Sequence, residues 1–167
     1  SRETIRSLKK YEELLINANK KQNLIGNSTI NQIWQRHFLD SAQVIDFVEK
    51  NEKALVDIGS GAGFPGLIVS IIAKDKKFPL KIKLVEKSPK KTIFLKKIIS
   101  ELKLSAEVIN RNVQDKEFKF IDEVFVARAF KPFPEILKLI HNKAKNFRKL
   151  IIFMGKTGHK ELLQASK

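Results

Sequence analysis

Three glycines alternate with other residues directly behind an acid in the segment Asp57–Gly63. The acid closes a short apolar run that begins at Leu55, and a second apolar run follows Gly66. This order predicts a strand, a tight turn and the start of a helix, where the backbone of an α/β fold can approach a nucleotide-like ligand. Because each glycine costs about 0.5–1 kcal/mol of backbone entropy relative to alanine, a bound ligand explains the pattern better than a plain turn.

Two classes of cofactor fit such a loop. Residues 61–66 match the G-x-G-x-x-G pattern of dinucleotide sites, but Asp57 would then repel a pyrophosphate. The alternative register has Asp57 at the strand tip and Gly59, Gly61 and Gly63 in the turn, as in the first motif of S-adenosylmethionine-dependent methyltransferases. That cofactor carries a sulfonium cation and no phosphate. We therefore expect S-adenosylmethionine to bind here, beside Asp57, with NAD as the alternative.

A second acid stands where a ribose is expected. Residues 80–85 alternate apolar and basic side chains, and Glu86 ends this predicted strand 20 residues after Gly66. A carboxylate at the tip of the second strand can hold the two ribose hydroxyls. Because both cofactors contain ribose, Glu86 supports a nucleoside without choosing between them.

The rest of the chain predicts the scaffold that positions these residues. Apolar periodicity, capping residues and breaks predict helices over 3–21, 29–48, 65–74, 88–103 and 132–147, and strands over 55–59, 80–86, 106–111, 122–128 and 149–154. Thr29 and Ser88 are the expected caps of the second and fourth helices. The alternation indicates a Rossmann-like α/β fold, with a mostly parallel central sheet and helices on both faces.

The same pattern suggests how the chain is organised. No strand precedes Leu55, so residues 1–50 are expected to form an N-terminal helical appendage to a core of residues 51–167, within one structural domain. Methyltransferase sheets usually close with a further antiparallel pair, and only 13 residues follow Met154. We therefore expect the core to lack its last strands.

The charge and composition of the chain indicate which classes of partner it can have. The chain has 33 Lys and Arg against 18 Asp and Glu, a net charge of +15, which favours a polyanionic partner such as nucleic acid over the compositional drift of an AT-rich genome. The absence of cysteine, and three scattered histidines at 37, 141 and 159, argue against a metal site. No apolar run approaches the ~20 residues of a membrane span, and no signal-peptide pattern is present. We expect a cytoplasmic protein without a membrane partner, and a monomer as the default where no pattern determines the oligomeric state.

Three motifs together resemble the bacterial 16S ribosomal RNA guanine-N7 methyltransferases, the family also called glucose-inhibited division protein B. They are RHFLDS at 36–41, the loop 57–66 with its GFPG ending, and VEKSPKK at 85–91, followed later by Ala127-Arg128-Ala129. The resemblance runs from about Asn23 to Lys156. It implies a class I methyltransferase fold, S-adenosylmethionine as cofactor, 16S ribosomal RNA or a small-subunit assembly particle as partner, and methyl transfer to N7 of a guanine.

The resemblance also implies particular contacts. It places the cofactor against Gly59, Phe64, Val113, Gln114 and Arg128. The family usually has arginine where Asn112 stands, glutamate where Gln114 stands and lysine where Met154 stands. Glutamine can still hydrogen-bond an adenine edge, so we expect re-shaped rather than abolished cofactor binding. The role of position 154 is open.

Two groups of residues are candidates for contact with the substrate. Arg36, His37 and Asp40 lie at helical offsets of three and four, so one helix face can present them. From the residues alone, docking of the appendage explains them somewhat better, whereas the resemblance favours substrate positioning together with Arg128. Lys90 and Lys91 lie in the first turn of the predicted helix 88–103, where cations oppose the helix dipole. Contact with RNA phosphates, shared with Arg36, and a solvated helix face explain these lysines equally well.

Methyl transfer to guanine N7 needs few catalytic groups from the protein. Guanine N7 has a lone pair and no proton, so methylation there needs no general base, and we expect none among the residues. The enzyme must orient the reactants and exclude water. An NAD-dependent oxidoreductase and a non-catalytic RNA-binding module on the same fold are the alternatives.

Overall fold

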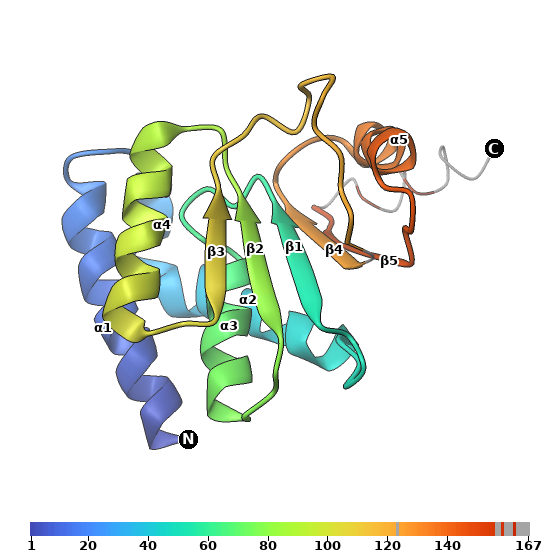
Figure 1. The fold of residues 1–167 in the computed structure, drawn as a ribbon. Helices are drawn as coiled ribbons and strands as arrows, with labels where there is room; N and C mark the ends of the chain where they lie inside the picture. The colour runs from blue at the N-terminus through green and yellow to red at the C-terminus, as the bar shows by residue number, and fades with distance from the viewer. Residues whose placement is uncertain (123, 156–157, 159–161, 163–167) are drawn as a thin grey trace.

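The computed structural model describes residues 1–122 and 124–155, together with 158 and 162. Within them, five parallel strands form one sheet in the order β3-β2-β1-β4-β5 (Figure 1). The strands are β1 (Ala54–Ile58), β2 (Lys81–Val85), β3 (Ala106–Ile109), β4 (Val124–Arg128) and β5 (Lys149–Phe153). Each begins and ends within two residues of the expected position, so the predicted strands are confirmed.

The strand order reverses at β1, which pairs with β2 on one side and with β4 on the other. Open α/β sheets bind their ligands outside the carboxyl ends of the strands at such a switch point. The residues that follow β1 and β2 are Gly59 and Glu86, and Ala129 follows β4. The topology therefore brings the glycine loop and the predicted ribose acid to one edge of the sheet.

Helices cover the two faces of the sheet unequally (Figure 1). The helices α1 (Arg2–Asn19), α3 (Gly66–Asp75) and α4 (Pro89–Leu102) pack on one face, and α5 (Phe133–Lys143) packs on the other. Alternate residues of β1 divide between the two layers. Leu55 packs with the first group of helices, whereas Val56 and Ile58 pack in the cluster that contains α5. As predicted, Ser88 caps α4, accepting a hydrogen bond from the main-chain N–H of Lys91 at 3.4 Å.

The second predicted helix is not regular. In its place the structure has a 3₁₀ helix (η1, Asn27–Gln32), a π-helix (η2, Trp34–Leu39), a short α2 (Asp40–Ala42) and a second 3₁₀ helix (η3, Gln43–Phe47). The expectation of one helix capped by Thr29 is wrong, because the Thr29 hydroxyl donates to the carbonyl of Gly26, at 2.8 Å, rather than accepting from the next turn. The register changes where Arg128 donates to main-chain oxygens of the segment, as described below.

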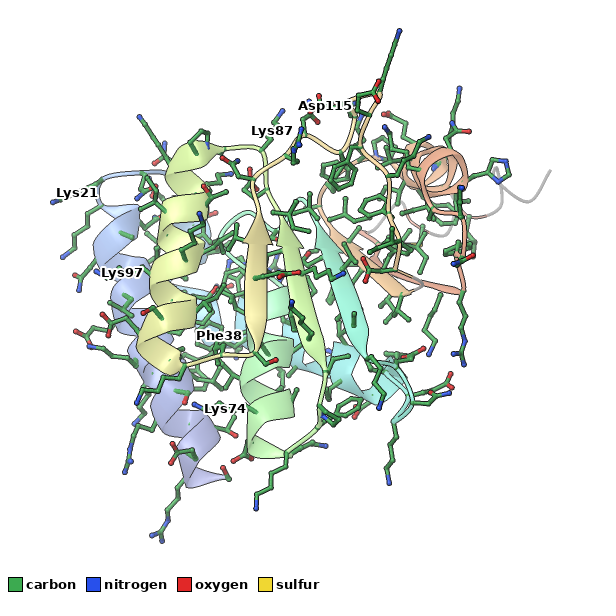
Figure 2. All side chains as sticks on the ribbon, viewed as in Figure 1. Lys21, Phe38, Lys74, Lys87, Lys97 and Asp115 are labelled. Atoms are coloured by element: carbon green, nitrogen blue, oxygen red, sulfur yellow. The ribbon has the colours of Figure 1, made fainter. Side chains whose placement is uncertain are left out.

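The N-terminal segment packs closely against the sheet layer. Tyr11 and Leu15 of α1 and Phe38 of η2 are almost fully buried, in the same hydrophobic cluster as Leu67 and Phe94. Phe38, labelled in Figure 2, is only 2 % exposed. The expected appendage therefore shares one core with the sheet, and its boundary at residue 50 stays a prediction.

None of the described helices is long and apolar enough to cross a membrane. The described residues also contain no group of three or more His, Asp or Glu side chains placed to hold a metal ion.

Candidate functional site

The glycine loop, residues 59–66, folds back over the end of β2. Gly59, Gly61 and Gly63 have positive φ angles of 72°, 58° and 105°, which L side chains rarely adopt. The main-chain N–H groups of Gly59 and Ser60 both donate to the carbonyl of Val85, at 2.9 and 3.1 Å. The loop is therefore held against β2 by its own backbone, in a conformation that needs glycine.

The three glycines differ in what a side chain would meet. A Cβ on Gly59 would overlap the ring of Phe130, and one on Gly63 would lie 2.9 Å from the Tyr11 hydroxyl and overlap a leucine. A Cβ on Gly61 would meet only the carbonyl of Gly59, at 3.8 Å. Packing inside the protein thus requires glycine at two of the positions and leaves open space beside Gly61.

Glu86 binds the main chain of Gly61 and lines the same cavity as that glycine, described below. Its Oε2 accepts a hydrogen bond from the main-chain N–H of Gly61 at 2.9 Å, and its Oε1 accepts one from Ser88 at 2.8 Å. The side chain is 7 % exposed. Each carboxylate oxygen holds one donor and retains a second lone-pair direction, so the oriented carboxylate can accept further hydroxyl hydrogens.

Asp57 lies on the opposite side of the loop. It is fully buried, and its Oδ2 accepts a hydrogen bond from the main-chain N–H of Gly66, at the start of α3, at 2.9 Å. Its Oδ1 has no hydrogen-bond partner among the described residues. Burial raises the pKa of Asp57 from 3.8 to about 7, although the hydrogen bond from Gly66 lowers it. We expected this acid beside the ligand, and the structure places it beneath the loop.

The N-terminal helix supports the loop from the same interior side. The Tyr11 hydroxyl, fully buried, donates to the carbonyl of Ala62 at 2.6 Å. Burial, and then the nearby Asp57 carboxylate, raises the pKa of Tyr11 well above its ordinary value, so the hydroxyl keeps its proton. Its ring packs against Phe38 and Phe64 at centroid distances of 5.5 and 5.6 Å. Helix α1 thus fixes the conformation of a loop that lies 51 residues away in sequence.

A cavity of about 420 Å³ opens between the glycine loop, the end of β2 and the loop after β4. The site residues expected from the sequence fall into two sets. The cavity is lined by His37, Gly59, Gly61, Phe64, Glu86, Lys91, Val113 and Arg128. The remaining candidates, Arg36, Asp40, Asp57, Gly63, Lys90 and Gln114, are not among its lining residues. Gln114 is exposed, and its N–H donates to the side chain of Asn112, which does line the cavity.

Arg128 ties the N-terminal segment to the end of β4. Its guanidinium donates to the main-chain oxygens of Arg36 and His37 in η2, and to the Ser41 hydroxyl at 3.4 Å. Asp40 Oδ2 lies 3.8 Å from Nη2. The Asp40 carboxylate and the main chain at Arg36 thus help to hold the segment against the end of β4, and a substrate contact by the Arg36 side chain stays a prediction. A side chain that bonds to carbonyls inside a helix can displace its regular register, and π-helical turns frequently occur at functional sites.

His37 lies where η2 meets the cavity. Its ring is half-buried and stacks on Phe64, with centroids 4.9 Å apart and planes 14° apart, while Nε2 lies 3.0 Å from the Thr29 hydroxyl. Burial, and then the charge of Arg128, lowers the pKa of His37 to about 4. The imidazole is therefore neutral at pH 7.

The cavity has a cationic rim that sequence reasoning found only in part. Lys87 and Arg111 line it together with Lys91. Figure 2 shows Lys87 at the edge where the strands end, whereas Lys74 and Lys97 lie on the outside of the helices, away from it. The signal for Lys87 was its place directly after Glu86, at the carboxyl end of a predicted strand.

Two apolar residues of the cavity were missed entirely. Leu24 and Ile25 line it, although they lie in a segment that the sequence suggests is a polar break. Their main-chain N–H groups donate to Oδ1 of the buried Asn19, at 2.8 and 2.9 Å. The available signal was a pair of large apolar residues inside an otherwise polar stretch.

Known proteins match this chain over most of its length. The GidB family model, described as rRNA small subunit methyltransferase G, matches residues 4–167. A Ribosomal RNA small subunit methyltransferase G from Pelagibacter ubique is 42% identical over 163 residues, which cover 96% of this chain and 76% of the relative. The protein of the same name from Rickettsia felis is 34% identical over 166 residues, covering 99% and 82%.

The fold is similar to that of solved methyltransferases. The crystal structure of a SAM-dependent methyltransferase from Aquifex aeolicus superimposes with a TM-score of 0.54 at 19% identity, covering 81% of this chain and 71% of that one. At that identity the likeness supports the class I methyltransferase fold alone. The family match and the two relatives establish that this chain belongs to the rRNA small subunit methyltransferase G family.

Proposed function

We propose that this chain is an S-adenosylmethionine-dependent methyltransferase that transfers a methyl group to N7 of a guanine in small-subunit ribosomal RNA. The observation that carries the proposal is the pairing of Gly61 with Glu86 at the wall of the cavity. An open space without a side chain lies beside an oriented carboxylate there, at the switch point of the sheet. Membership of the family supplies the reaction and the RNA, and the resemblance supplies the atom N7.

The residues around the cavity fit this cofactor. Its volume of about 420 Å³ is within the ~300–1,000 Å³ usual for small-molecule sites. Glu86 would hold the ribose hydroxyls, Gly59 and Gly61 would let the backbone approach, and Val113 would flank the adenine. Asp57 contributes indirectly, because it fixes the loop through Gly66 rather than facing a ligand. Because it does not face the cavity, the Asp57 carboxylate would not repel the pyrophosphate of a dinucleotide. The preference for S-adenosylmethionine over NAD therefore rests on the family match.

The bound cofactor supplies a methyl group activated on a sulfonium sulfur. The chain's own residues then have to orient the base and exclude water. Leu24, Ile25 and Phe64 give the cavity apolar walls for this purpose. Since N7 carries no proton, no side chain has to act as a general base, and the neutral His37 adds no positive charge beside a base that becomes cationic.

The rim supplies contacts for a polyanion. Lys87, Lys91 and Arg111 border the same cavity, so RNA phosphates could be held there while one base enters. In an A-form helix the major groove that contains N7 is too deep and narrow for side chains to read. The target is therefore expected in an unpaired or loop position, from which the base can reach the cavity.

Calorimetric titration with S-adenosylhomocysteine and, separately, with NAD tests the cofactor. The parent should bind the first and not the second. Gly61→Ala puts a methyl group in the open space and should weaken S-adenosylhomocysteine at least tenfold. The control Gly155→Ala also adds a methyl group where no atom lies within 4 Å, and it should bind like the parent. Equal binding by Gly61→Ala, or binding of NAD alone, would refute the cofactor site.

Salt-dependent binding tests the RNA interface. Lys90→Ala/Lys91→Ala removes two cations at the start of α4, and Lys96→Ala/Lys97→Ala removes two exposed ones farther along the same helix. The log–log slope of affinity for 16S ribosomal RNA against salt should shrink by roughly 0.7–0.9 per lost phosphate contact. We expect the first variant to lose one to two contacts and the second none. Equal slopes would make Lys90 and Lys91 a solvated helix face.

A further inference from the structure

One ring nitrogen of His37 has its proton assigned by the hydrogen-bond network. The Thr29 hydroxyl, which has a single hydrogen, lies 2.8 Å from the carbonyl of Gly26 and 3.0 Å from His37 Nε2. A carbonyl oxygen can only accept, so the hydroxyl must donate to Gly26. The remaining contact requires Nε2–H of His37 to donate to the Thr29 oxygen. A neutral imidazole with its proton on Nε2 has a bare lone pair on Nδ1.

That lone pair has no use inside the described protein. Nδ1 makes no hydrogen bond to any residue within 1–122 and 124–155, and it is not among their buried, unpartnered polar atoms. It is therefore accessible, on a ring that borders the cavity. The ring itself is fixed, because it stacks on Phe64 and is tethered at Nε2.

We propose that Nδ1 of His37 accepts a hydrogen bond from the Watson–Crick edge of the methyl-accepting base, and so selects guanine over adenine. This inference rests on the proposed function. Guanine presents two adjacent donors on that edge, N1–H and the N2 amine, whereas adenine presents an acceptor at N1 and has its single donor, the N6 amine, where guanine has the acceptor O6. A fixed, acceptor-only nitrogen that faces the N1 position pairs with the N1–H of guanine and repels the N1 lone pair of adenine. A site built to hydrogen-bond one base in this way rejects the analogue that cannot make the bond.

The charges around His37 keep the nitrogen an acceptor. Arg128 and Arg36 oppose a second proton on the ring, and their effect together with burial outweighs Asp40, so the pKa stays near 4. A 180° flip of the ring would keep the stacking on Phe64 but would lose the hydrogen bond between Nε2 and Thr29, so this bond is what holds Nδ1 in place.

Nucleotide binding and ¹⁵N NMR of the full chain, saturated with S-adenosylhomocysteine, test the assignment. Guanosine, inosine and adenosine 5′-monophosphates serve as probes. The parent should carry its His37 proton on Nε2, shift its Nδ1 signal when the guanosine nucleotide is added, and bind that nucleotide about two- to tenfold more tightly than the adenosine one, the range of one neutral hydrogen bond. The inosine nucleotide, which lacks the N2 amine, shows which of the two guanine donors is used.

Three variants separate recognition from mere packing. His37→Phe keeps a ring against Phe64 without an acceptor, and at saturating S-adenosylhomocysteine it should lose the preference for the guanosine over the adenosine nucleotide. His37→Asn, whose amide oxygen can take the place of Nδ1, should recover part of the preference. His141→Phe, on the exposed last turn of α5, is the matched control and should behave as the parent.

Two results would overturn the inference: a proton on Nδ1 in the parent, or an unchanged ratio of guanosine to adenosine nucleotide binding in His37→Phe. Failure of the proposed function would look different. It would appear as no methyl transfer by the parent to small-subunit ribosomal RNA.

Discussion

Asp57 and Glu86 end neighbouring strands of the same sheet, yet their carboxylates lie on opposite sides of the glycine loop. Glu86 borders the cavity and accepts from Gly61, whereas Asp57 is buried beneath the loop and accepts from Gly66. The difference follows from where each strand stops. Asp57 lies inside β1, so strand alternation turns it to the same helix-covered face as Leu55, while Glu86 follows the last residue of β2 and can turn to the cavity.

An acid near a strand end is therefore not by itself a ligand contact. One residue more or less of strand decides between a group that faces a ligand and a group that shapes the backbone around it. Both carboxylates accept hydrogen bonds from main-chain N–H groups of the same loop, one from each side of it. Substitutions at the two positions should therefore separate stability from binding.

The largest difference is expected in the pH dependence of stability. Because the folded pKa of Asp57 is raised from 3.8 to about 7, the folded protein binds this proton more tightly than the unfolded chain does. The stabilisation by that proton is complete below about pH 4 and is lost as pH rises to about 7, a change on the order of 4 kcal/mol at 1.36 kcal/mol per pKa unit. Asp57→Asn cannot ionise, so the difference in unfolding free energy between the variant and the parent should shift by that amount in favour of the variant.

Urea unfolding between pH 4 and pH 8 measures this difference. A difference between Asp57→Asn and the parent that stays constant across this pH range would mean that Asp57 is not buried as described.

The next effect concerns binding rather than stability. Glu86→Ala removes a charged acceptor from the cavity wall and should weaken S-adenosylhomocysteine by about 1.5–3 kcal/mol, the range for hydrogen bonds to a charged group. Calorimetry measures the loss. Glu107→Ala, an acid of β3 that pairs with Lys81 at 2.8 Å, is the matched control and should leave the affinity unchanged. If Glu86→Ala binds as the parent does, Glu86 only holds the loop through Gly61 and makes no contact with the ligand.

Much of the scaffold was predictable because it depends on local patterns. The alternation of apolar residues indicated all of the described strands, Ser88 indicated the start of α4, and the glycine spacing located the loop. These features depend on neighbours within a few residues. The local sequence is therefore enough to predict them.

The parts that could not be predicted depend on partners far away in the sequence. The π-helix contacts Arg128, about 90 residues later, and no side-chain periodicity announces that contact. The side of the loop on which Asp57 lies depends on the exact end of β1. The inclusion of Leu24 and Ile25 in the cavity depends on the side chain of Asn19, which holds their backbone in place.

A smaller effect should distinguish the glycines on the two sides of the loop. A Cβ on Gly66 would lie 2.7 Å from Asp57 Oδ2 and overlap Leu84, so Gly66→Ala should destabilise the fold by about 1–3 kcal/mol, as overpacked cores do. Gly61→Ala meets open space, and its cost to stability should be confined to its positive φ, roughly 1–2 kcal/mol. Thermal or urea unfolding measures both losses of stability. In titrations with S-adenosylhomocysteine the ranking should be reversed, with Gly61→Ala losing more affinity than Gly66→Ala. If the two variants rank alike in stability and in binding, the loop does not have distinct interior and ligand sides.

The smallest effect is expected at the support that α1 gives to the loop. Tyr11→Phe keeps the ring against Phe38 and Phe64 and removes only the hydroxyl that donates to Ala62. A buried carbonyl then loses its donor, which should cost about 1 kcal/mol of unfolding free energy. Because Ala62 lines the cavity, part of this cost should appear as weaker S-adenosylhomocysteine binding, by a few-fold at most. Urea unfolding and calorimetry on one preparation measure the two together. If the unfolding free energy and the S-adenosylhomocysteine affinity of Tyr11→Phe both match the parent, the Tyr11 hydroxyl does not support the loop. If the variant loses more affinity than Glu86→Ala does, Tyr11 acts on the ligand rather than on the loop.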